Sequence, residues 1–151
     1  MRGRYFEELD VGTRWVTSGR TLTQSDILNF AGFNGDFNPL HVDEEFAKTT
    51  MYGGVVASAP LVFAMMSGMF SQLGHLDGTG RGWLDLTWLK VHHYVHPGET
   101  LHLEVEIVSK EDGPRPGVGT ITWHEVMINQ RGEKIIEQER RTMVARRGAD
   151  V

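Results

Sequence analysis

The chain has 151 residues, of which 40% are hydrophobic and 23% are charged, and its formal net charge is −5. This share of apolar side chains excludes a disordered chain, and the lack of cysteine excludes disulfides, zinc–thiolate sites, iron–sulfur clusters and a cysteine nucleophile. The acidic balance disfavours nucleic acid or an anionic membrane as the main partner, because binding to phosphates depends on excess Lys and Arg.

We expect one domain over residues 1–151, because no repeat, linker or low-complexity segment divides the chain. The first eight residues lack the apolar stretch of a signal peptide. The longest apolar run, Val55–Phe70, is interrupted by Ser, Pro and Gly, and it is too short to span a bilayer. These features predict a cytoplasmic protein, which agrees with the absence of cysteine.

The first half of the chain predicts short helices and loops after an opening strand at Arg14–Ser18. The segment Thr23–Asp26 is typical of a helix start, and Gly32 is expected to end this helix. A dense loop follows, and a second short helix is expected to begin at about Glu44. The third predicted helix, Ala59–Leu73, carries apolar side chains on nearly every side, which is typical of a buried helix.

The second half predicts four strands separated by turns: Trp83–Val95, Leu101–Val108, Val118–Asn129 and Lys134–Ala145. The first of them changes its alternation partway along, which indicates a bulge or a bend. Strands at hairpin spacing predict an antiparallel sheet. A curved sheet of this kind wrapped around the apolar helix is an economical way to cover it, so we predict an α+β fold.

The loop between the first two helices holds an acid and an imidazole five residues apart, Asp36 and His41, on either side of an Asn-Pro pair. We expect this loop to be non-helical, because Pro39 removes a donor and pushes Asn38 out of the α region. A constrained loop can direct both side chains to one point, where they could activate a water molecule. The alternative is an ordinary turn with a capping carboxylate and a structural histidine.

The loop sequence Gly-Asp-Phe-Asn-Pro-Leu-His-Val-Asp, residues 35–43, resembles the signature of the MaoC-like, or (R)-specific enoyl-CoA hydratase, family. The likeness continues through Phe46-Ala47, Gly53–Ala57 and the apolar helix, and it resumes at His96–Leu101. It covers about residues 10–145. The resemblance implies a hotdog fold, in which a curved antiparallel β-sheet wraps a long central helix and two copies form a dimer.

The same resemblance implies a lyase of fatty acid metabolism that reversibly adds water across the 2,3 double bond of an enoyl thioester. Asp36 and His41 would hold the water, and Asn38 would be a structural loop residue. A backbone N–H at the start of the long helix, here that of Ala59, would stabilise the negative charge that develops on the thioester oxygen. The substrate would be a CoA or acyl-carrier-protein thioester, and no metal or redox cofactor is expected.

The chain departs from the family where Ser58-Ala59-Pro60 replaces a His-Gly-Met segment. Ala59 keeps its N–H, but its Cβ and the following proline narrow the backbone choices, so we expect a changed acyl preference rather than lost activity. Ser58 is compatible with a plain N-cap role or with substrate contact. Ser67 matches a serine of the family's helix and is expected to support the site.

Other functions and sites are weaker candidates. His92 and His93 are expected on opposite faces of a strand, so we predict no joint metal site there. A hotdog thioesterase is the second enzymatic hypothesis, but many thioesterases place an acid on the central helix, and this helix contains no Asp or Glu. A non-catalytic acyl-thioester-binding or partner subunit is the third, although Asp36 and His41 are both retained. We expect a homodimer or a higher homo-oligomer.

Overall fold

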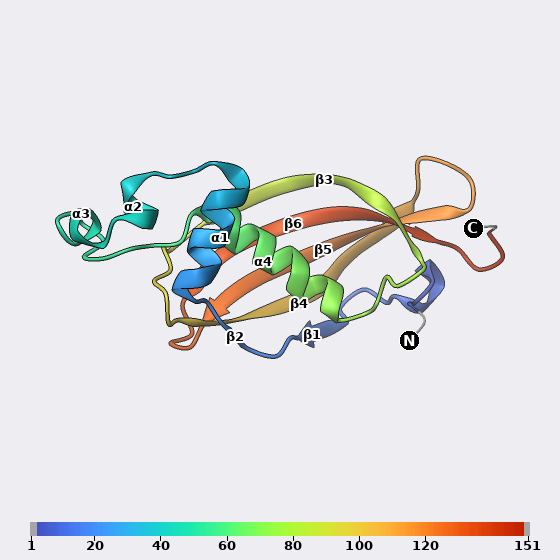
Figure 1. Cartoon of the computed structure of the whole chain (residues 1–151). Coiled ribbons are helices and arrows are strands. Elements are labelled where there is room, and N and C mark those ends of the chain that lie inside the picture. Colours follow the sequence, from blue (N-terminus) through green and yellow to red (C-terminus); the bar gives the residue numbers. More distant parts are fainter. Residues whose placement is uncertain (1–2, 150–151) are drawn as a thin grey trace.

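The computed structural model describes residues 3–149 and consists of an antiparallel sheet with helices on one face (Figure 1). The long strands are β3 (Gly80–Val91), β4 (Thr100–Asp112), β5 (Val118–Asn129) and β6 (Lys134–Ala145). Their order is β1-β4-β5-β6-β3, and β2 also pairs with β4. The short strands β1 (Arg14–Val16) and β2 (Arg20–Thr21) therefore form one edge, and the twelve-residue β3 forms the other. A short 3-10 helix, η1 (Phe6–Glu8), precedes β1.

Helix α4 (Ala59–Gln72) lies across the curved sheet and builds the core (Figure 1). Its buried side chains pack with buried residues of the sheet, among which Trp123 is fully enclosed. The remaining side of α4 carries the exposed small residues Ala64 and Gly68. The prediction that this helix is covered on all sides is therefore wrong for the single chain. The predicted α+β fold, with a curved antiparallel sheet against the helix, is confirmed.

The helical segment between β2 and α4 contains α1 (Gln24–Asn34), α2 (Pro39–Val42) and α3 (Glu44–Lys48). Helix α1 begins with the predicted capping box of Thr23 and Asp26. The prediction that this helix ends at Gly32 is wrong, because the helix continues to Asn34. Gly35 ends it with φ of 80°, a left-handed conformation that glycine adopts without steric cost.

The loop that carries Asp36 and His41 contains one helical turn, α2, contrary to the non-helical prediction. Pro39 occupies its first position, where a missing N–H costs little, and Asn38 caps it with φ of −54° and ψ of 131°, outside the α region. The steric rule for Asn38 was therefore correct, but it described the residue before the helix rather than the whole loop. Together α2 and α3 form an arm that projects beyond the sheet (Figure 1).

Strands β5 and β6 have the bounds predicted from their flanking turns. Strand β4 extends beyond its predicted end at Val108 to Asp112. Strand β3 runs from Gly80 to Val91 rather than from Trp83 to Val95. Its pairing with β6 shifts register at three places between Gly80 and Trp88, so the strand is irregular, but the shifts lie before the predicted change of alternation at Leu89. Because β3 ends at Val91, the following histidines lie outside the strand and are free of its alternation.

An ion pair lies buried on the sheet between β5 and β6. Arg140 and Gln138 both donate to the fully buried Glu125, and the Arg140 guanidinium also lies 4.0 Å from the centre of the Phe70 ring. Burial raises the pKa of Glu125, and the positive charge of Arg140 opposes that shift.

No helix in the described part of the chain is both long and apolar enough to cross a membrane.

Candidate active site

A cavity of about 610 Å³ lies at the N-terminal end of α4, between the helical arm and the end of the sheet. One wall comes from the arm and the start of α4, and the other from the segment after β3 and the start of β6. The lining is mostly apolar, and its polar side chains are Asp36, His41, Tyr52, Ser58, His92, His93 and Tyr94. A mostly apolar cavity with a few polar groups is the usual form of a small-molecule site.

Asp36 and His41 face each other in this cavity, as predicted. The distance from Asp36 Oδ2 to His41 Nε2 is 3.6 Å, and the His41 side chain is 13% exposed. His41 Nδ1 lies 2.7 Å from the backbone oxygen of Val56. A carbonyl oxygen only accepts, so Nδ1 carries a proton, and in the neutral form of the imidazole the lone pair of Nε2 is directed to Asp36.

This tautomer leaves two acceptors opposite each other. A carboxylate oxygen and an unprotonated Nε2 cannot hydrogen-bond directly, but one water molecule can donate to both. The 3.6 Å separation exceeds a normal direct hydrogen bond, which suits a bridging donor placed beside the pair. The geometry therefore offers a place where the oxygen of a water is polarised by two bases at once.

The loop holds Asp36 through its own backbone. Asp36 N–H donates to the side chain of Asn34 at 3.0 Å, and Asn38 N–H donates to Asp36 Oδ1 at 3.3 Å. Asn38 Oδ1 in turn accepts from Leu40 N–H at 3.0 Å. Asn38 thus caps α2 and fixes the turn between the two functional side chains, which is the structural role expected for it.

The start of α4 supplies a free backbone donor to the same cavity. Ala59 is the first helical residue and lines the cavity, and among the described residues its N–H has no acceptor. Pro60 has no N–H, and the next two amides both donate to the carbonyl of Ser58. The Ala59 N–H is therefore the first donor at the positive end of the helix. Ser58 is 8% exposed and makes no side-chain cap.

Ser67 is not brought to this site. It lies eight residues beyond Ala59 on α4, roughly 12 Å along the helix axis, and it is absent from the cavity lining. The residues that do come together are Asp36, His41, Ser58 and Ala59, with Asn38 behind them.

The opposite wall contains a carboxylate–imidazole pair that sequence reasoning did not find. His92 lines the cavity, and its Nε2 lies 2.9 Å from Glu137 Oε2 on β6. Lys134 and His124 also contact this carboxylate at 2.9 and 3.0 Å. These partners, Lys134 first, lower the pKa of Glu137 to about 2. His93 lines the same cavity, contrary to the prediction that it faces away from His92.

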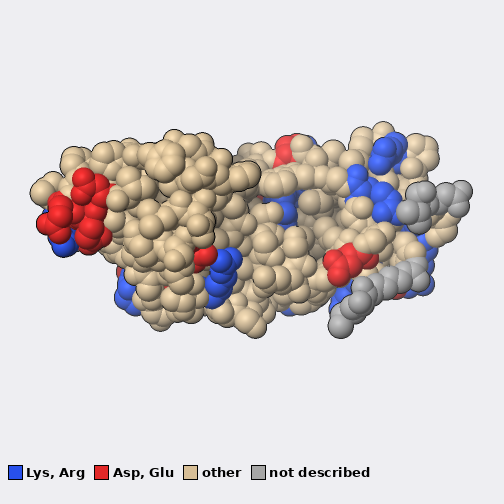
Figure 2. Space-filling model, viewed as in Figure 1, with Lys and Arg blue, Asp and Glu red and all other residues tan. Residues whose placement is uncertain are grey.

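Charge is distributed unevenly around the cavity. Acidic side chains gather over α3 at the tip of the arm, where Glu44 and Glu45 lie (Figure 2). The surface over α1 and the first half of α4 is largely uncharged in the same view. Within residues 3–149, no group of three or more His, Asp or Glu side chains, the cluster of His92, His124 and Glu137 included, has an arrangement that could hold a metal ion.

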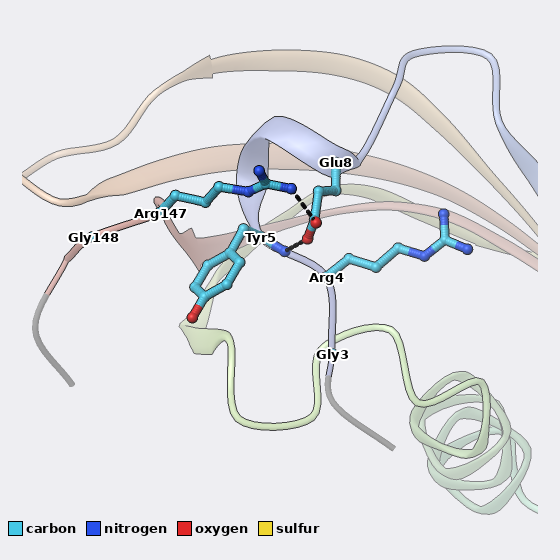
Figure 3. Close-up of a pocket in the computed structure, with 6 residues that line it drawn as sticks. All are labelled: Gly3, Arg4, Tyr5, Glu8, Arg147 and Gly148. Carbon is cyan, nitrogen blue, oxygen red and sulfur yellow. Dashed lines mark hydrogen bonds and ion pairs between the residues drawn. The ribbon is translucent and has the colours of Figure 1, made fainter.

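A second cavity of about 700 Å³ lies where the first and the last described residues meet (Figure 3). In its lining, Arg147 is paired with Glu8, which also accepts from the Tyr5 N–H. This cavity has no histidine among its lining residues and no facing acid–base pair. The smaller cavity at α4 is therefore the better candidate for an active site.

Comparison with known proteins identifies the family. A model of the MaoC-like domain matches residues 9–139. The chain belongs to the MaoC-like dehydratase family. Among curated relatives, it is 30% identical over 144 residues to an (R)-specific enoyl-CoA hydratase of Rhodospirillum rubrum, with 95% of this chain and 94% of the relative covered. It is also 30% identical over 107 residues to a 3-hydroxybutyryl-CoA dehydratase of Methylorubrum extorquens, covering 71% of this chain and 66% of that one.

Solved structures confirm the hotdog fold. The chain resembles a MaoC-like dehydratase from Rhodospirillum rubrum with a TM-score of 0.85 and 28% identity, covering 96% of this chain and 99% of that one. A double hotdog protein from Mycobacterium tuberculosis matches with a TM-score of 0.85 and 21% identity, covering 99% of this chain and 46% of that one. The second match supports the fold alone.

Proposed function

We propose that this member of the MaoC-like family is an enoyl-thioester hydratase, which adds water reversibly across the 2,3 double bond to give a 3-hydroxyacyl thioester. The observation that carries the proposal is the facing pair of Asp36 Oδ2 and His41 Nε2 at 3.6 Å in a mostly apolar cavity. The names of the two curated relatives support the same reaction class.

In this proposal one water molecule donates to both Asp36 and His41, which leaves an oxygen lone pair directed into the cavity. As the oxygen bonds to the β-carbon, the π electrons of the double bond move toward the thioester, and one water proton passes to the pair. A proton then returns from the pair to the α-carbon. Atoms and charge balance without another reactant.

The thioester oxygen gains negative charge in the enolate-like transition state, and the free N–H of Ala59 would donate to it. A donor placed in advance where charge develops is worth about 10²–10³ in rate. The reacting acyl group would therefore lie between the start of α4 and the Asp36–His41 pair. The apolar lining from Val62, Val91 and Ile136 would receive the acyl chain.

A thioesterase is the second candidate, because the same water could attack the carbonyl carbon instead. Helix α4 contains no Asp or Glu to serve as its acid or nucleophile, which favours the hydratase. The hydrogen bond from His41 Nδ1 to the Val56 carbonyl fixes the tautomer of His41, and a non-catalytic binding subunit would not need that tautomer.

The deciding experiment is a panel of trans-2-enoyl-CoA thioesters of increasing chain length, monitored for loss of the conjugated enoyl absorbance while free thiol is measured in parallel. We expect absorbance loss with formation of 3-hydroxyacyl product and no thiol release. Thiol release without hydration would support the thioesterase. Neither change, with the thioester still bound, would support the binding subunit.

A further inference from the structure

The segment Val55–Ala57, which we call the strap, enters α4 and is hydrogen-bonded at every residue. Val55 N–H donates to Glu44 at 3.3 Å, Val56 N–H donates to the Leu40 carbonyl at 3.2 Å, and Ala57 N–H donates to the Val95 carbonyl at 2.8 Å. Its first two carbonyls accept from imidazoles. The strap is thus held both by the helical arm and by the segment that connects β3 with β4.

The two imidazoles, of His41 and His96, hydrogen-bond to consecutive peptide units. His41 Nδ1 donates to the carbonyl of Val56 at 2.7 Å, and His96 Nδ1 donates to the carbonyl of Val55 at 2.8 Å. His41 is the proposed catalytic base, but His96 does not line the cavity. Its position next to the strap therefore requires a different explanation from direct contact with substrate.

His96 is itself anchored to the end of the sheet. Its backbone N–H donates to Glu99 Oε2 at 2.7 Å, and Glu99 is only 6% exposed. The other oxygen of Glu99 accepts from Asn129 at 3.2 Å and from Arg131 at 2.6 Å, at the turn between β5 and β6. A series of hydrogen bonds thus runs from the sheet through Glu99 and His96 to the Val55 carbonyl.

The start of α4 needs such an external anchor. Ser58 is its N-cap residue but makes no side-chain cap, so the local bonds of the first turn of α4 are the two backbone bonds to the Ser58 carbonyl. The Ala59 N–H lies two residues beyond the strap, and its direction depends on the strap's backbone. A displacement of an oxyanion donor by a fraction of an ångström weakens it in the transition state.

We infer that His96 is a positioning residue, which holds the Val55 carbonyl so that the Ala59 N–H points at the thioester oxygen. This inference rests on the proposed hydratase function for its catalytic consequence, but the placement of the strap by His96 stands on the geometry alone. His96 and His41 then hold adjacent peptide units of the strap, and in this way they align the two halves of the site. One half is the Ala59 N–H, and the other is the Asp36–His41 pair.

The test compares His96→Leu, which removes the donor, with His96→Asn, whose amide nitrogen can take the place of Nδ1. His102→Leu serves as the matched control, because this histidine is part-exposed on β4 and outside the cavity. The first measurement is amide hydrogen exchange over residues 55–59. We expect faster exchange there in His96→Leu, near wild-type exchange in His96→Asn, and no change in the control.

The second measurement is hydration kinetics. We expect kcat to fall about 10–100-fold in His96→Leu with KM changed much less, since the oxyanion exists only in the transition state. His96→Asn should recover most of this loss. The pH dependence of kcat should keep its wild-type shape in both variants, because His96 exchanges no proton with substrate, whereas His41→Gln should change that shape.

The outcomes separate the inference from the function it rests on. Unchanged exchange at 55–59 in His96→Leu would overturn the positioning role, whatever the kinetics show. Faster exchange with unchanged kcat would overturn the link to the oxyanion donor. If the wild-type protein hydrates no enoyl thioester while the exchange differences persist, the proposed function fails and the placement of the strap by His96 remains.

Discussion

At the scale of single residues, the proposed chemistry depends on Asp36 and His41. Asp36→Asn keeps the shape of the side chain without the carboxylate charge, and His41→Gln removes the base. An acid–base role is worth about 10²–10⁴ in rate, so each variant should lose at least ~100-fold in kcat while circular dichroism shows an intact fold. The double variant should be little worse than the poorer single one, because both groups act on one water.

Matched controls for this prediction are Asp10→Asn and His102→Gln, which change the same residue types outside the cavity. These should keep wild-type kcat. Near-normal hydration by either Asp36→Asn or His41→Gln would contradict the assignment of the pair.

The sequence could indicate these two residues because they lie close together on one constrained loop. It could not indicate the Val56 carbonyl that sets the tautomer of His41, since that oxygen comes from 15 residues further along. The contacts of His96 with Val55 and of His92 with Glu137 span 41 and 45 residues. Such contacts depend on how β3, β6 and the strap are arranged in space, and the spacing of nearby residues in the sequence does not indicate them.

At the scale of elements, the pairing between the end of β3 and β6 predicts sensitivity to acid. The pKa of Glu137 is lowered to about 2 from an ordinary value of 4.5, so its ion pairs stabilise the fold above about pH 4.5. This contribution is lost as the pH falls from there toward 2. The full shift corresponds to ~3 kcal/mol, and solvent screening of the partly exposed partners reduces it to about 1–2 kcal/mol.

The measurement is the free energy of unfolding by urea between pH 7 and pH 2.5. Glu137→Gln should be less stable than wild type at pH 7, and the difference should shrink as the pH falls. Glu45→Gln is the control, because the Glu45 side chain is 86% exposed and its pair with Lys48 should contribute little. A constant difference between Glu137→Gln and wild type across the range would contradict the prediction.

The N-terminus of α4 is the element expected to set acyl preference. Ser58, Ala59 and Pro60 all line the cavity, so restoring His-Gly-Met should change its shape beside the oxyanion donor. One methylene group more or less in an apolar pocket is worth ~1–3 kcal/mol, so ratios of kcat/KM among acyl chains should move by roughly ten-fold or more. A uniform fall across all chain lengths would show that this segment does not set specificity.

Element boundaries were predictable where local turn chemistry decides them. Strands β5 and β6 end at loops and turns rich in Gly and Pro or in polar residues, and their bounds follow from the sequence. Gly32 and Gly35 could both have ended α1, and only the backbone shows that Gly35 takes the left-handed conformation. The start of β3 at Gly80 was missed because Gly80, Arg81 and Gly82 have no apolar side chains whose alternation could indicate a strand.

At the scale of the whole molecule, the long strand β3 leaves one edge of the sheet open. It pairs with β6 on one side only, and five of its apolar side chains are at least 38% exposed: Trp83, Leu84, Trp88, Leu89 and Val91. The neighbouring surface over α1 and α4 carries little charge (Figure 2). A long apolar edge is a liability unless it is covered, and pairing across a two-fold axis covers it in both copies.

We therefore expect a dimer of about twice 17.0 kDa by light scattering at micromolar concentration. A charge placed on the edge should disrupt it, because burying an unpaired ammonium group in an apolar interface is costly. Leu84→Lys should shift the mass toward the monomer, whereas Val11→Lys, at a position 57% exposed and away from β3, should leave it unchanged. A wild-type mass of one chain, or a mass unaffected by Leu84→Lys, would show that the edge of β3 is not the interface.

If dimer formation also completes the cavity, Leu84→Lys should lower kcat/KM in proportion to the fraction of monomer, and raising the protein concentration should restore it.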